Sequence, residues 1–293
     1  MLKGRLGLET ARIPHKDRHG LLWLSRGVLS VEDGTLRFVT GGTPDMDAGD
    51  YAIPFQGVSM IVMGPGSTIS HDALRLLARH GTALVAAGDD GVRCYSAMPF
   101  GPDDSAMARR QARAWADEEV RTMIARRMYA WRLGEVLPHR DISVLRGIEG
   151  ARMKETYRLL AAKYGVTWQG RRYDRADPHA ADPANQAINH ASTAVEGAAM
   201  IAVATTATLP QLGFIHEDSA ISFILDIADL FRDSVTLPVA FKAVRESERR
   251  PDISLERIVR RQAGRELKDA AVIDGMIGRI KELLDADDRG RHP

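Results

Sequence analysis

The sequence predicts an α+β protein of two domains, a small N-terminal domain rich in β-strands and a larger all-α domain. Short apolar segments between turn residues fill the first hundred or so positions. From Ala106 onward, long segments rich in Ala, Arg, Leu and Met have the helical period instead. Because a Pro-, Gly- and Asp-rich stretch lies between these patterns, we place the domains and their connections at residues 1–97 (β-rich domain), 98–105 (linker), 106–285 (helical domain) and 286–293 (charged tail).

The β-rich domain is predicted from apolar runs that end at turn signals. Glu32-Asp33-Gly34 and Asp89-Asp90-Gly91 are typical of hairpin turns. One helix interrupts the strands, with Ser70 as its N-cap and Gly81 as its stop. The predicted strands are 21–24, 28–31, 35–40, 58–63, 82–86 and 92–95.

The second domain shows apolar residues three and four apart, with few β-branched clusters. This spacing predicts amphipathic and buried helices that pack on one another. The predicted helices are approximately 106–133, 141–163, 184–208, 219–231, 237–247, 254–264 and 269–285.

Composition excludes several classes of protein. Cys94 is the single cysteine among 293 residues, so no intramolecular disulfide can form and a reducing cytoplasm is expected. The first twenty residues contain charges and lack the apolar core of a secretory signal. The longest nearly uncharged stretch, 197–212, is shorter than a membrane span of about 20 residues. We therefore expect a cytoplasmic protein with no membrane association.

The net charge of +1 hides an uneven distribution. Residues 109–175 contain sixteen Lys and Arg against eight Asp and Glu, a local charge of +8, so the rest carries −7. A basic central segment suggests that a polyanion binds there. A set of solvated helix faces with ion pairs would give the same counts, and the sequence alone does not separate the two interpretations.

An acidic pair interrupts the apolar run 221–231. Asp226 and Asp229 lie three residues apart, so on a helix their carboxylates share a face. Ionised carboxylates among apolar side chains must be paired, protonated or bound to a metal. Oxygen ligands suit Mg²⁺ or Mn²⁺, and a nearby imidazole such as His216 extends the set toward Mn²⁺. Alternatively, one aspartate pairs with Arg232 and the other caps a helix.

A second acidic position lies between two glycines inside a helical pattern. Glu149 is flanked by Gly147 and Gly150. Each glycine costs a helix about 1 kcal/mol relative to alanine, so the pair needs a reason. The close approach of another backbone or of a ligand is the usual one.

The stretch 164–174 mixes aromatic and arginine side chains. Arg171 and Arg172 lie among Tyr164, Trp168 and Tyr173. Such a mixture suits single-stranded or frayed nucleic acid, through phosphate pairing and base stacking. The alternative is a connecting segment whose Trp168 fills the core.

Together these residues resemble the CRISPR-associated protein one family, the integrase of CRISPR spacer acquisition, and in particular its subtype I-E branch. The matching blocks occur in the family's order and extend over roughly residues 5–270. They are Pro14-His-Lys-Asp-Arg18, Leu145-Arg-Gly-Ile-Glu-Gly150, Tyr164-Gly-Val-Thr-Trp168, Gly170-Arg-Arg-Tyr-Asp174, Gly213-Phe-Ile-His216, Ser222-Phe223 and Asp226-Ile-Ala-Asp229.

The resemblance implies a metal-dependent DNA endonuclease and integrase whose helical domain is catalytic. Glu149, His216 and Asp226 match the family's metal ligands, for Mg²⁺ or Mn²⁺, and Asp229 matches the second catalytic aspartate. Such an enzyme joins the 3′-hydroxyl ends of prespacer DNA to the repeat borders of a CRISPR array by transesterification. We expect Asp226→Ala or His216→Ala to abolish joining and to leave the fold intact.

The resemblance also implies DNA contacts and protein partners. The DNA is a duplex with single-stranded ends (the prespacer) together with CRISPR repeat DNA. The protein partners are a second copy of the chain, which dimerises through the β-rich domain, and CRISPR-associated protein two, in a four-plus-two complex. Positions where relatives contact DNA are Arg75, Arg93, Arg146, Arg171, Arg172 and Tyr173.

The sequence departs from the family at three positions. Arg26 and Leu225 stand where relatives carry an aromatic side chain, and Ser219 stands where others carry lysine. These changes affect how DNA ends would be splayed and how a protospacer-adjacent motif would be sensed.

Two other functions compete with integration. One is a metal-dependent nuclease that acts on branched DNA in repair. The other is a non-catalytic DNA-binding scaffold with a structural acidic cluster, which predicts a salt-bridge partner for each carboxylate.

Overall fold

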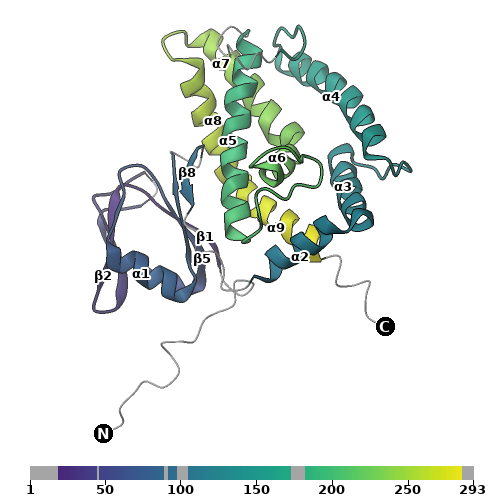
Figure 1. Ribbon diagram of the computed structural model, residues 1–293. Coiled ribbons are helices and arrows are strands. Elements are labelled where there is room, and N and C mark those ends of the chain that lie inside the picture. Colours follow the sequence, from purple (N-terminus) through teal and green to yellow (C-terminus); the bar gives the residue numbers. More distant parts are fainter. Residues whose placement is uncertain (1–18, 45, 89–91, 98–104, 173–181, 286–293) are drawn as a thin grey trace. The chain divides into compact units, whose positions relative to one another are not determined.

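The computed structural model describes residues 19–44, 46–88, 92–97, 105–172 and 182–285, and it confirms the predicted α+β class (Figure 1). The described residues form two compact units. The β-rich unit contains those up to 88 together with 94–97, 105 and 204–207, and the helical unit contains the rest. Residues 98–104 of the predicted linker and the predicted tail, 286–293, lie outside the described residues, so the boundaries placed there stay predictions.

The β-rich unit contains two four-stranded sheets. One has the order β1-β5-β7-β8, with parallel pairing from β1 to β7 and an antiparallel β8. The other has the order β4-β3-β2-β6, in which β6 is parallel to β2 and the remaining pairs are antiparallel. The bounds are β1 (His19–Leu24), β2 (Gly27–Glu32), β3 (Thr35–Thr40), β4 (Gly49–Ala52), η2 (Phe55–Gly57), β5 (Val58–Met63), β6 (Thr68–Ile69), α1 (His71–His80), β7 (Ala83–Ala87) and β8 (Cys94–Ala97).

Local sequence explains the turns of this unit. Asp33 and Gly34 both have positive φ, 50° and 76°, which is the geometry of a tight hairpin turn between β2 and β3. The Ser70 side chain accepts the N–H of Ala73 at the start of α1, and Gly81 ends the helix in the left-handed conformation. The predicted hairpin at 32–34 and the predicted helix are therefore confirmed.

The last strand differs from its prediction. β8 begins at Cys94, two residues after the predicted start, and it pairs antiparallel with β7 through an irregular register at Ala86 and Ala87. The predicted turn at 89–91 lies outside the described residues. Leu29, Phe38, Ile61 and neighbouring apolar side chains form the buried core of this unit.

The helical unit includes a long, alanine-rich helix, α5, many of whose side chains are buried (Figure 1). α3 packs against α2 and α4, α7 against α4 and α8, and α9 against α2, α6 and α8. No helix in the described part of the chain is both long and apolar enough to span a membrane. The bounds are α2 (Ala106–Ala116), α3 (Glu118–Leu133), α4 (Ile142–Tyr164), α5 (Pro183–Thr205), α6 (Ser222–Asp229), the π-helix η4 (Arg232–Thr236), α7 (Leu237–Arg249), α8 (Leu255–Asp269) and α9 (Val272–Asp285).

Two predicted helices have wrong boundaries for identifiable reasons. The predicted helix 106–133 is two helices, because the Asp117 carboxylate accepts the N–H groups of Glu119 and Val120 and starts a new helix there. The predicted helix 254–264 continues to Asp269, because Gly264 is buried inside α8 and does not end it.

α6 is shorter than the predicted 219–231. Ser219 lies outside the helix. Its backbone N–H donates to the Ser222 hydroxyl oxygen, and the Ser222 hydroxyl donates to the Ser219 carbonyl oxygen. These bonds close a turn just before the helix. α6 therefore presents Asp226 and Asp229 on two consecutive turns of a short, largely buried helix.

Candidate active site

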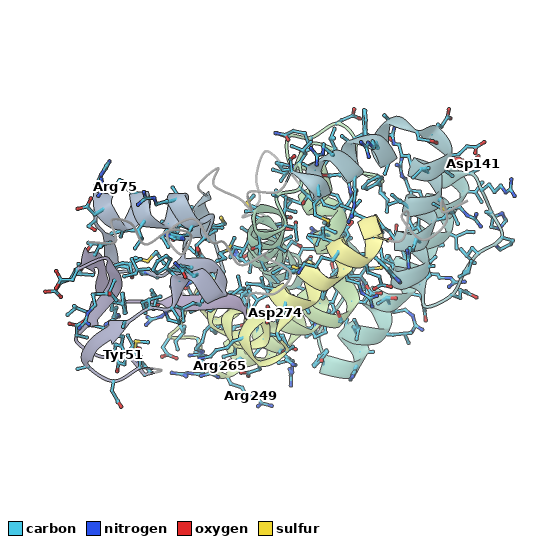
Figure 2. All side chains as sticks on the ribbon, turned by 90° about the horizontal axis from the view of Figure 1, so that it is seen from below. Tyr51, Arg75, Asp141, Arg249, Arg265 and Asp274 are labelled. Atoms are coloured by element: carbon cyan, nitrogen blue, oxygen red, sulfur yellow. The ribbon has the colours of Figure 1, made fainter. Side chains whose placement is uncertain are left out.

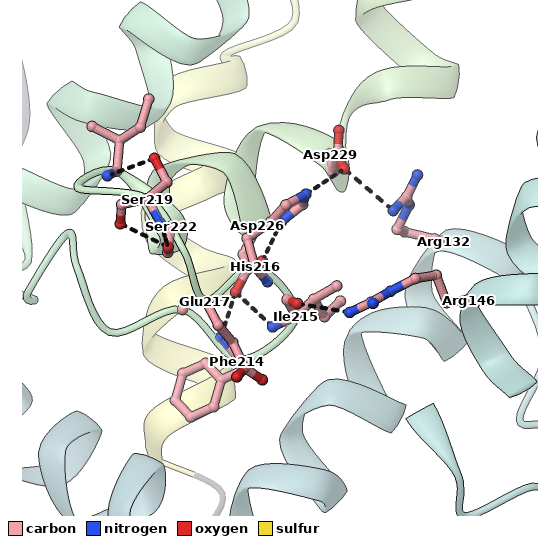
Figure 3. A network of polar contacts seen from close by, with 12 residues as sticks. Arg132, Arg146, Phe214, Ile215, His216, Glu217, Ser219, Ser222, Asp226 and Asp229 are labelled. Atoms are coloured by element: carbon pink, nitrogen blue, oxygen red, sulfur yellow. Dashed lines mark hydrogen bonds and ion pairs between the residues drawn. The ribbon is translucent and has the colours of Figure 1, made fainter. Parts of the chain in front are cut away.

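The predicted catalytic side chains come from three separate parts of the helical unit. Glu149 lies on α4. His216 lies on the irregular segment between α5 and α6, and Asp226 and Asp229 lie on α6 (Figure 3). His216 Nδ1 is 2.7 Å from Asp226 Oδ1, and His216 Nε2 is 3.9 Å from Asp229 Oδ2. Glu149 joins the group indirectly, because it and Asp229 bind the same arginine, Arg132 of α3.

The segment before His216 is fixed by side chains of α2. Gln111 is fully buried and donates to the carbonyl oxygens of Leu209 and Leu212, while its own oxygen accepts the Leu209 N–H at 2.6 Å. Trp115 Nε1 donates to the Gly213 carbonyl oxygen at 2.9 Å. The Gln111 amide and the Trp115 indole thus fix the conformation of a segment that has no helix or strand.

Gly213 is required at its position by a close approach. A Cβ atom there would lie 2.2 Å from the His216 carbonyl oxygen and 2.8 Å from Ser222 Cβ. On the far side, the Arg146 guanidinium donates to the Ile215 carbonyl oxygen at 3.1 Å. The chain therefore turns tightly at 213–216 and presents the imidazole toward α6.

The Asp226 side chain of α6 holds this turn in place. Its carboxylate has no exposed surface and accepts four hydrogen bonds. Oδ2 accepts the backbone N–H groups of Phe214 and Ile215 at 2.5 and 3.1 Å, and Oδ1 accepts the backbone N–H of His216 at 2.9 Å and its Nδ1 at 2.7 Å (Figure 3). A buried carboxylate is stable when its lone pairs are satisfied in this way.

Asp226 in turn sets the state of His216. The hydrogen bond to Asp226, with a smaller contribution from the charge of Asp229, raises the pKa of the imidazole above its ordinary value, against the effect of burial. With Nδ1 donating to Asp226, a neutral ring carries its lone pair on Nε2, the nitrogen that faces Asp229. A carboxylate behind a histidine is the usual support of a metal-binding imidazole.

Glu149 and Asp229 are held by arginines. Arg132 Nη2 lies 2.6 Å from Glu149 Oε1, and Arg132 Nη1 lies 3.5 Å from Asp229 Oδ2. Arg232 binds the other oxygen of Asp229 at 3.0 Å and donates to the Tyr157 hydroxyl at 2.9 Å. Burial raises the pKa of the Glu149 carboxyl, and the charge of Arg132 opposes that rise.

The donor set can be compared with the needs of a divalent ion. Among the described residues, no three His, Cys, Asp or Glu side chains are placed to share one ion as they lie. The chemistry of Glu149, Asp229 and His216 Nε2 nevertheless fits Mg²⁺ or Mn²⁺, since it offers two carboxylates and an oriented imidazole. The prediction that Asp226 is a ligand does not match the geometry, because both of its oxygens are already occupied by N–H donors.

The alternative interpretation of the acidic pair is correct in part. Asp229 does pair with Arg232. Asp226 caps the turn at 214–216 and not a helix. Each carboxylate of the group has a charged or imidazole partner, as the scaffold hypothesis requires.

A small cavity adjoins the site and adds a carboxyl that the sequence analysis missed. The cavity has a volume of about 70 Å³, and Glu196, His216, Asp229 and Arg232 help to line it. Glu196 lies on α5, and burial, reinforced by the charge of Asp229, raises its pKa. Its sequence context, an alanine-rich helix, gave no signal of its proximity to α6.

Aromatic packing decides the interpretation of Trp168. Its ring stacks on Tyr157 at a centroid distance of 5.1 Å and meets Phe241 edge-on at 5.9 Å. The tryptophan therefore packs within the protein, as the core alternative proposed. Through the Tyr157 hydroxyl, this stack also supports Arg232 behind Asp229.

The predicted DNA-binding residues on the 165–172 segment are ordered by Asn185 of α5. The fully buried amide accepts Arg171 Nη1 and the Arg172 N–H, and it donates to the Gly170 carbonyl oxygen. Both arginines are exposed, but Arg171 also donates to Asn189 at 2.7 Å, whereas only the backbone N–H of Arg172 is held by Asn185. Tyr173 lies outside the described residues. Sequence reasoning missed Asn185.

The other predicted DNA-binding arginines lie elsewhere. Arg75 is on the exposed face of α1 in the β-rich unit and pairs with Asp72 at 3.0 Å (Figure 2). Arg93 pairs with Glu256 at 2.7 Å within the helical unit. Arg146 supports the turn at Ile215, as described above. The structure thus gives Arg75, Arg93 and Arg146 partners inside the chain.

The glycines beside Glu149 have no packing reason within the described chain. A Cβ atom at Gly147 or Gly150 would meet no heavy atom within 4 Å. The expected approach of another backbone is therefore absent from the described residues. The approach of a ligand stays a prediction for these two positions.

Comparison with known proteins identifies the family of this chain. The family model for "CRISPR associated protein Cas1" matches residues 21–137 and 131–256. The chain belongs to the Cas1 family. It is 38% identical over 241 residues to the CRISPR-associated endonuclease Cas1 of Escherichia coli (strain K12), covering 82% of this chain and 77% of that one. The subtype I-E assignment stays a prediction.

Solved structures extend the comparison. The crystal structure of the TtCas1–DNA complex superposes with a TM-score of 0.81 at 30% identity, covering 94% of this chain and 99% of that one. A casposase bound to integration product has a TM-score of 0.64 at 14% identity, covering 92% and 96%, which shows a shared fold. The chain therefore shares the fold of a solved Cas1 structure.

Proposed function

We propose that this Cas1-family protein is a divalent-metal-dependent DNA integrase and endonuclease of CRISPR adaptation. It joins the 3′-hydroxyl ends of prespacer DNA to the repeat borders of an array. The observation that carries the proposal is the orientation of His216 Nε2 by the buried Asp226 toward Asp229, beside Glu149. The names of the relatives, which are endonucleases, support the same class of reaction.

We assign the metal ligands as Glu149, His216 and Asp229, for Mg²⁺ or Mn²⁺, and the orienting role to Asp226. When bound, the ion would polarise the scissile phosphate and lower the pKa of the attacking hydroxyl. Glu149 and Asp229 supply the negative charge for it from two helices, and the Asp226 hydrogen bond keeps His216 Nε2 directed toward the same place.

The reaction exchanges one phosphodiester for another. The 3′ oxygen of the incoming strand forms a bond to phosphorus while the bond from phosphorus to the repeat's own 3′ oxygen breaks, and that oxygen leaves as a hydroxyl. Neither ATP nor a covalent enzyme intermediate is needed. The role of the protein is to position the groups and to balance charge, as in phosphoryl transfer generally. With water as the nucleophile, the same site hydrolyses DNA.

DNA binding is part of the proposal. The solved TtCas1 structure is a complex with DNA, which supports it. The net charge of +8 over residues 109–175 suits a polyanion. Among the described arginines that the resemblance assigns to DNA, the exposed Arg172 is the best candidate contact, because the side chains of the other four already have partners inside the chain. A homodimer and a four-plus-two complex with CRISPR-associated protein two follow from the family resemblance.

A strand-transfer assay tests the function. The purified protein is mixed with CRISPR-associated protein two, a prespacer and a repeat-bearing plasmid, with Mn²⁺ or with EDTA. We expect joining at the repeat borders that EDTA abolishes, and a loss of at least a hundred-fold in Glu149→Gln and Asp229→Asn. Glu135→Gln is the control, because Glu135 forms an exposed pair with Arg152 and should leave joining unchanged.

The outcomes separate the three hypotheses. Joining that continues in EDTA, or in both acidic variants, contradicts the metal-dependent mechanism. No joining, together with DNA binding that EDTA leaves unchanged, supports the scaffold. Cleavage of branched DNA without CRISPR-associated protein two and without preference for the repeat supports the repair nuclease.

A further inference from the structure

Arg132 lies between the two carboxylates of the proposed metal set. Its guanidinium binds Glu149 of α4 at 2.6 Å with one nitrogen and faces Asp229 of α6 at 3.5 Å with another. Figure 3 shows the Arg132 side chain directed at Asp229 from a neighbouring helix. Only 8% of the side chain is exposed, so this is an internal ion pair and not a surface one.

A cation at this position meets a real electrostatic need. Glu149 and Asp229 are both largely buried, with 15% and 19% of their side chains exposed, and their negative charges repel one another. A guanidinium is always charged and offers several donors in one plane, so it can bridge two carboxylates. Arg132 therefore does for the two acids what a divalent ion would do.

The guanidinium and an ion would compete for the same oxygens. Asp229 Oδ1 accepts Arg232, and its Oδ2 faces both Arg132 and His216 Nε2. An ion that binds His216 Nε2 and Asp229 Oδ2 would thus meet a positive charge a few ångströms away. That charge must move away for the ion to bind tightly.

The two arginines at Asp229 are not equivalent. Arg232 is also held by the Tyr157 hydroxyl, which is itself stacked on Trp168. Both ion pairs of Arg132 are with acids of the proposed metal set. Arg232 is therefore built to stay in place, whereas Arg132 loses its partners as soon as an ion takes them.

We propose that Arg132 is an internal counter-cation of the active site. It holds Glu149 and Asp229 together before the ion binds, and it withdraws from at least one of them when Mg²⁺ or Mn²⁺ enters. Arg132 is a positioning residue that lowers the affinity of the site for the ion and keeps the metal-free fold stable. The inference rests on the metal ligands proposed above.

Mn²⁺ binding to the full chain tests the inference without any activity measurement. Affinity is measured by calorimetry and by electron paramagnetic resonance of free Mn²⁺, and Tm is measured in EDTA and in Mn²⁺. We expect Arg132→Gln to bind Mn²⁺ at least ten-fold more tightly than the wild type, to have a lower Tm in EDTA and to show a larger rise of Tm with Mn²⁺. A variant that merely loosened the fold would bind Mn²⁺ less tightly.

Arg152→Gln is the matched control. Arg152 also pairs with a glutamate, Glu135, but this pair is exposed and includes no proposed ligand, although Arg152 lies one turn from Glu149 on α4. Its loss should change neither Mn²⁺ affinity nor the effect of Mn²⁺ on Tm. If Arg132→Gln and Arg152→Gln changed the Mn²⁺ affinity and the Tm by the same amounts, the loss of any nearby positive charge would explain both results. That outcome would overturn the inference.

Failure of the inference and failure of the metal site give different results. Wild-type binding of Mn²⁺ with equal or weaker binding by Arg132→Gln overturns the counter-cation alone. No Mn²⁺ binding by either protein overturns the proposed metal set as well. If Arg132→Gln does not fold, Arg132→Lys replaces it. Lysine keeps the charge without bridging both acids, so at least three-fold tighter binding is expected, and equal or weaker binding overturns the inference.

Discussion

The carboxylates on the two sides of the acidic site are held by different kinds of donor. On one side, Asp226 is buried and holds three backbone N–H groups and an imidazole. On the other side, Glu149 and Asp229 are partly exposed and are held by long arginine side chains. Backbone donors cannot leave, whereas guanidinium groups can rotate away. The first side is therefore a fixed frame, and the second is the part able to exchange one cation for another.

This difference assigns different roles to two aspartates that the sequence presents as a pair. Their spacing of three residues places both on α6, but the Asp226 side chain is buried inside the protein, whereas the Asp229 side chain lines the cavity. Variants of the two residues should therefore fail in different ways, which gives the largest expected effect.

Asp226→Ala should destabilise the fold strongly, in contrast to the intact fold that the sequence analysis expected. It leaves three buried N–H groups and the His216 Nδ1 without their acceptor, and each unsatisfied group costs about 1–3 kcal/mol. We expect the free energy of unfolding to fall by roughly 3–5 kcal/mol, measured by urea titration. Asp229→Ala should lower it by less than about half as much, because its arginines keep other partners. Equal losses would contradict the division into frame and exchangeable side.

How far the sequence could predict this site depends on the kind of contact. The turn signals at 32–34, the cap at Ser70 and the stop at Gly81 act within a few residues, so local reasoning found them. The acidic pair and Glu149 stood out from the apolar and glycine residues around them, and the family resemblance gave them and His216 their catalytic roles. Neither could tell which aspartate faces inward, since that depends on a turn whose shape needs Gln111 and Trp115 from a distant helix.

Arg132, Asn185 and Glu196 show the same limit. Arg132 is one arginine among many in a basic segment, and only the packing of α3 on α4 places it between two acids. Asn185 binds a segment fifteen residues earlier in the chain. A single sequence contains no periodic or spacing signal for such contacts. They become visible only when the helices are packed.

Gly213→Ala tests whether the frame must keep its shape. The added Cβ would lie 2.2 Å from the His216 carbonyl oxygen, so the turn has to shift. A displacement of about 1 Å in a catalytic group can cost roughly a hundred-fold in rate, and we expect a loss of that order in strand transfer. Gly41→Ala is the control, because a Cβ atom there meets nothing within 4 Å. Full activity in Gly213→Ala would show that the turn tolerates movement.

Gly147→Ala and Gly150→Ala test whether DNA approaches the helix surface beside Glu149. Each should increase stability but weaken DNA binding. Each should raise the free energy of unfolding by about 0.5–1 kcal/mol, because alanine favours the helix and open space receives the methyl group. If DNA approaches this face, each should also weaken DNA binding, measured by fluorescence anisotropy. Gly278→Ala in α9 is the matched control, expected to stabilise without any effect on DNA. Stabilised variants with unchanged DNA binding would place the DNA elsewhere.

The smallest expected effect is the pH dependence that Asp226 imposes through His216. The folded protein raises the pKa of His216, because Nδ1 donates to the Asp226 carboxylate. The imidazolium is therefore favoured by folding, and its contribution to stability is complete below the ordinary histidine pKa of about 6.5 and is lost as the pH rises through the folded value.

Titration of His216 by NMR in EDTA should show the raised pKa in the wild type and a lower one in Asp226→Asn, whose neutral amide no longer favours the charged ring. Since a metal ion needs the unprotonated Nε2, Mn²⁺ affinity of the wild type should fall as the pH drops through the same pKa. Titration curves of His216 that coincide in the two proteins would mean that the buried carboxylate orients the ring without controlling its charge.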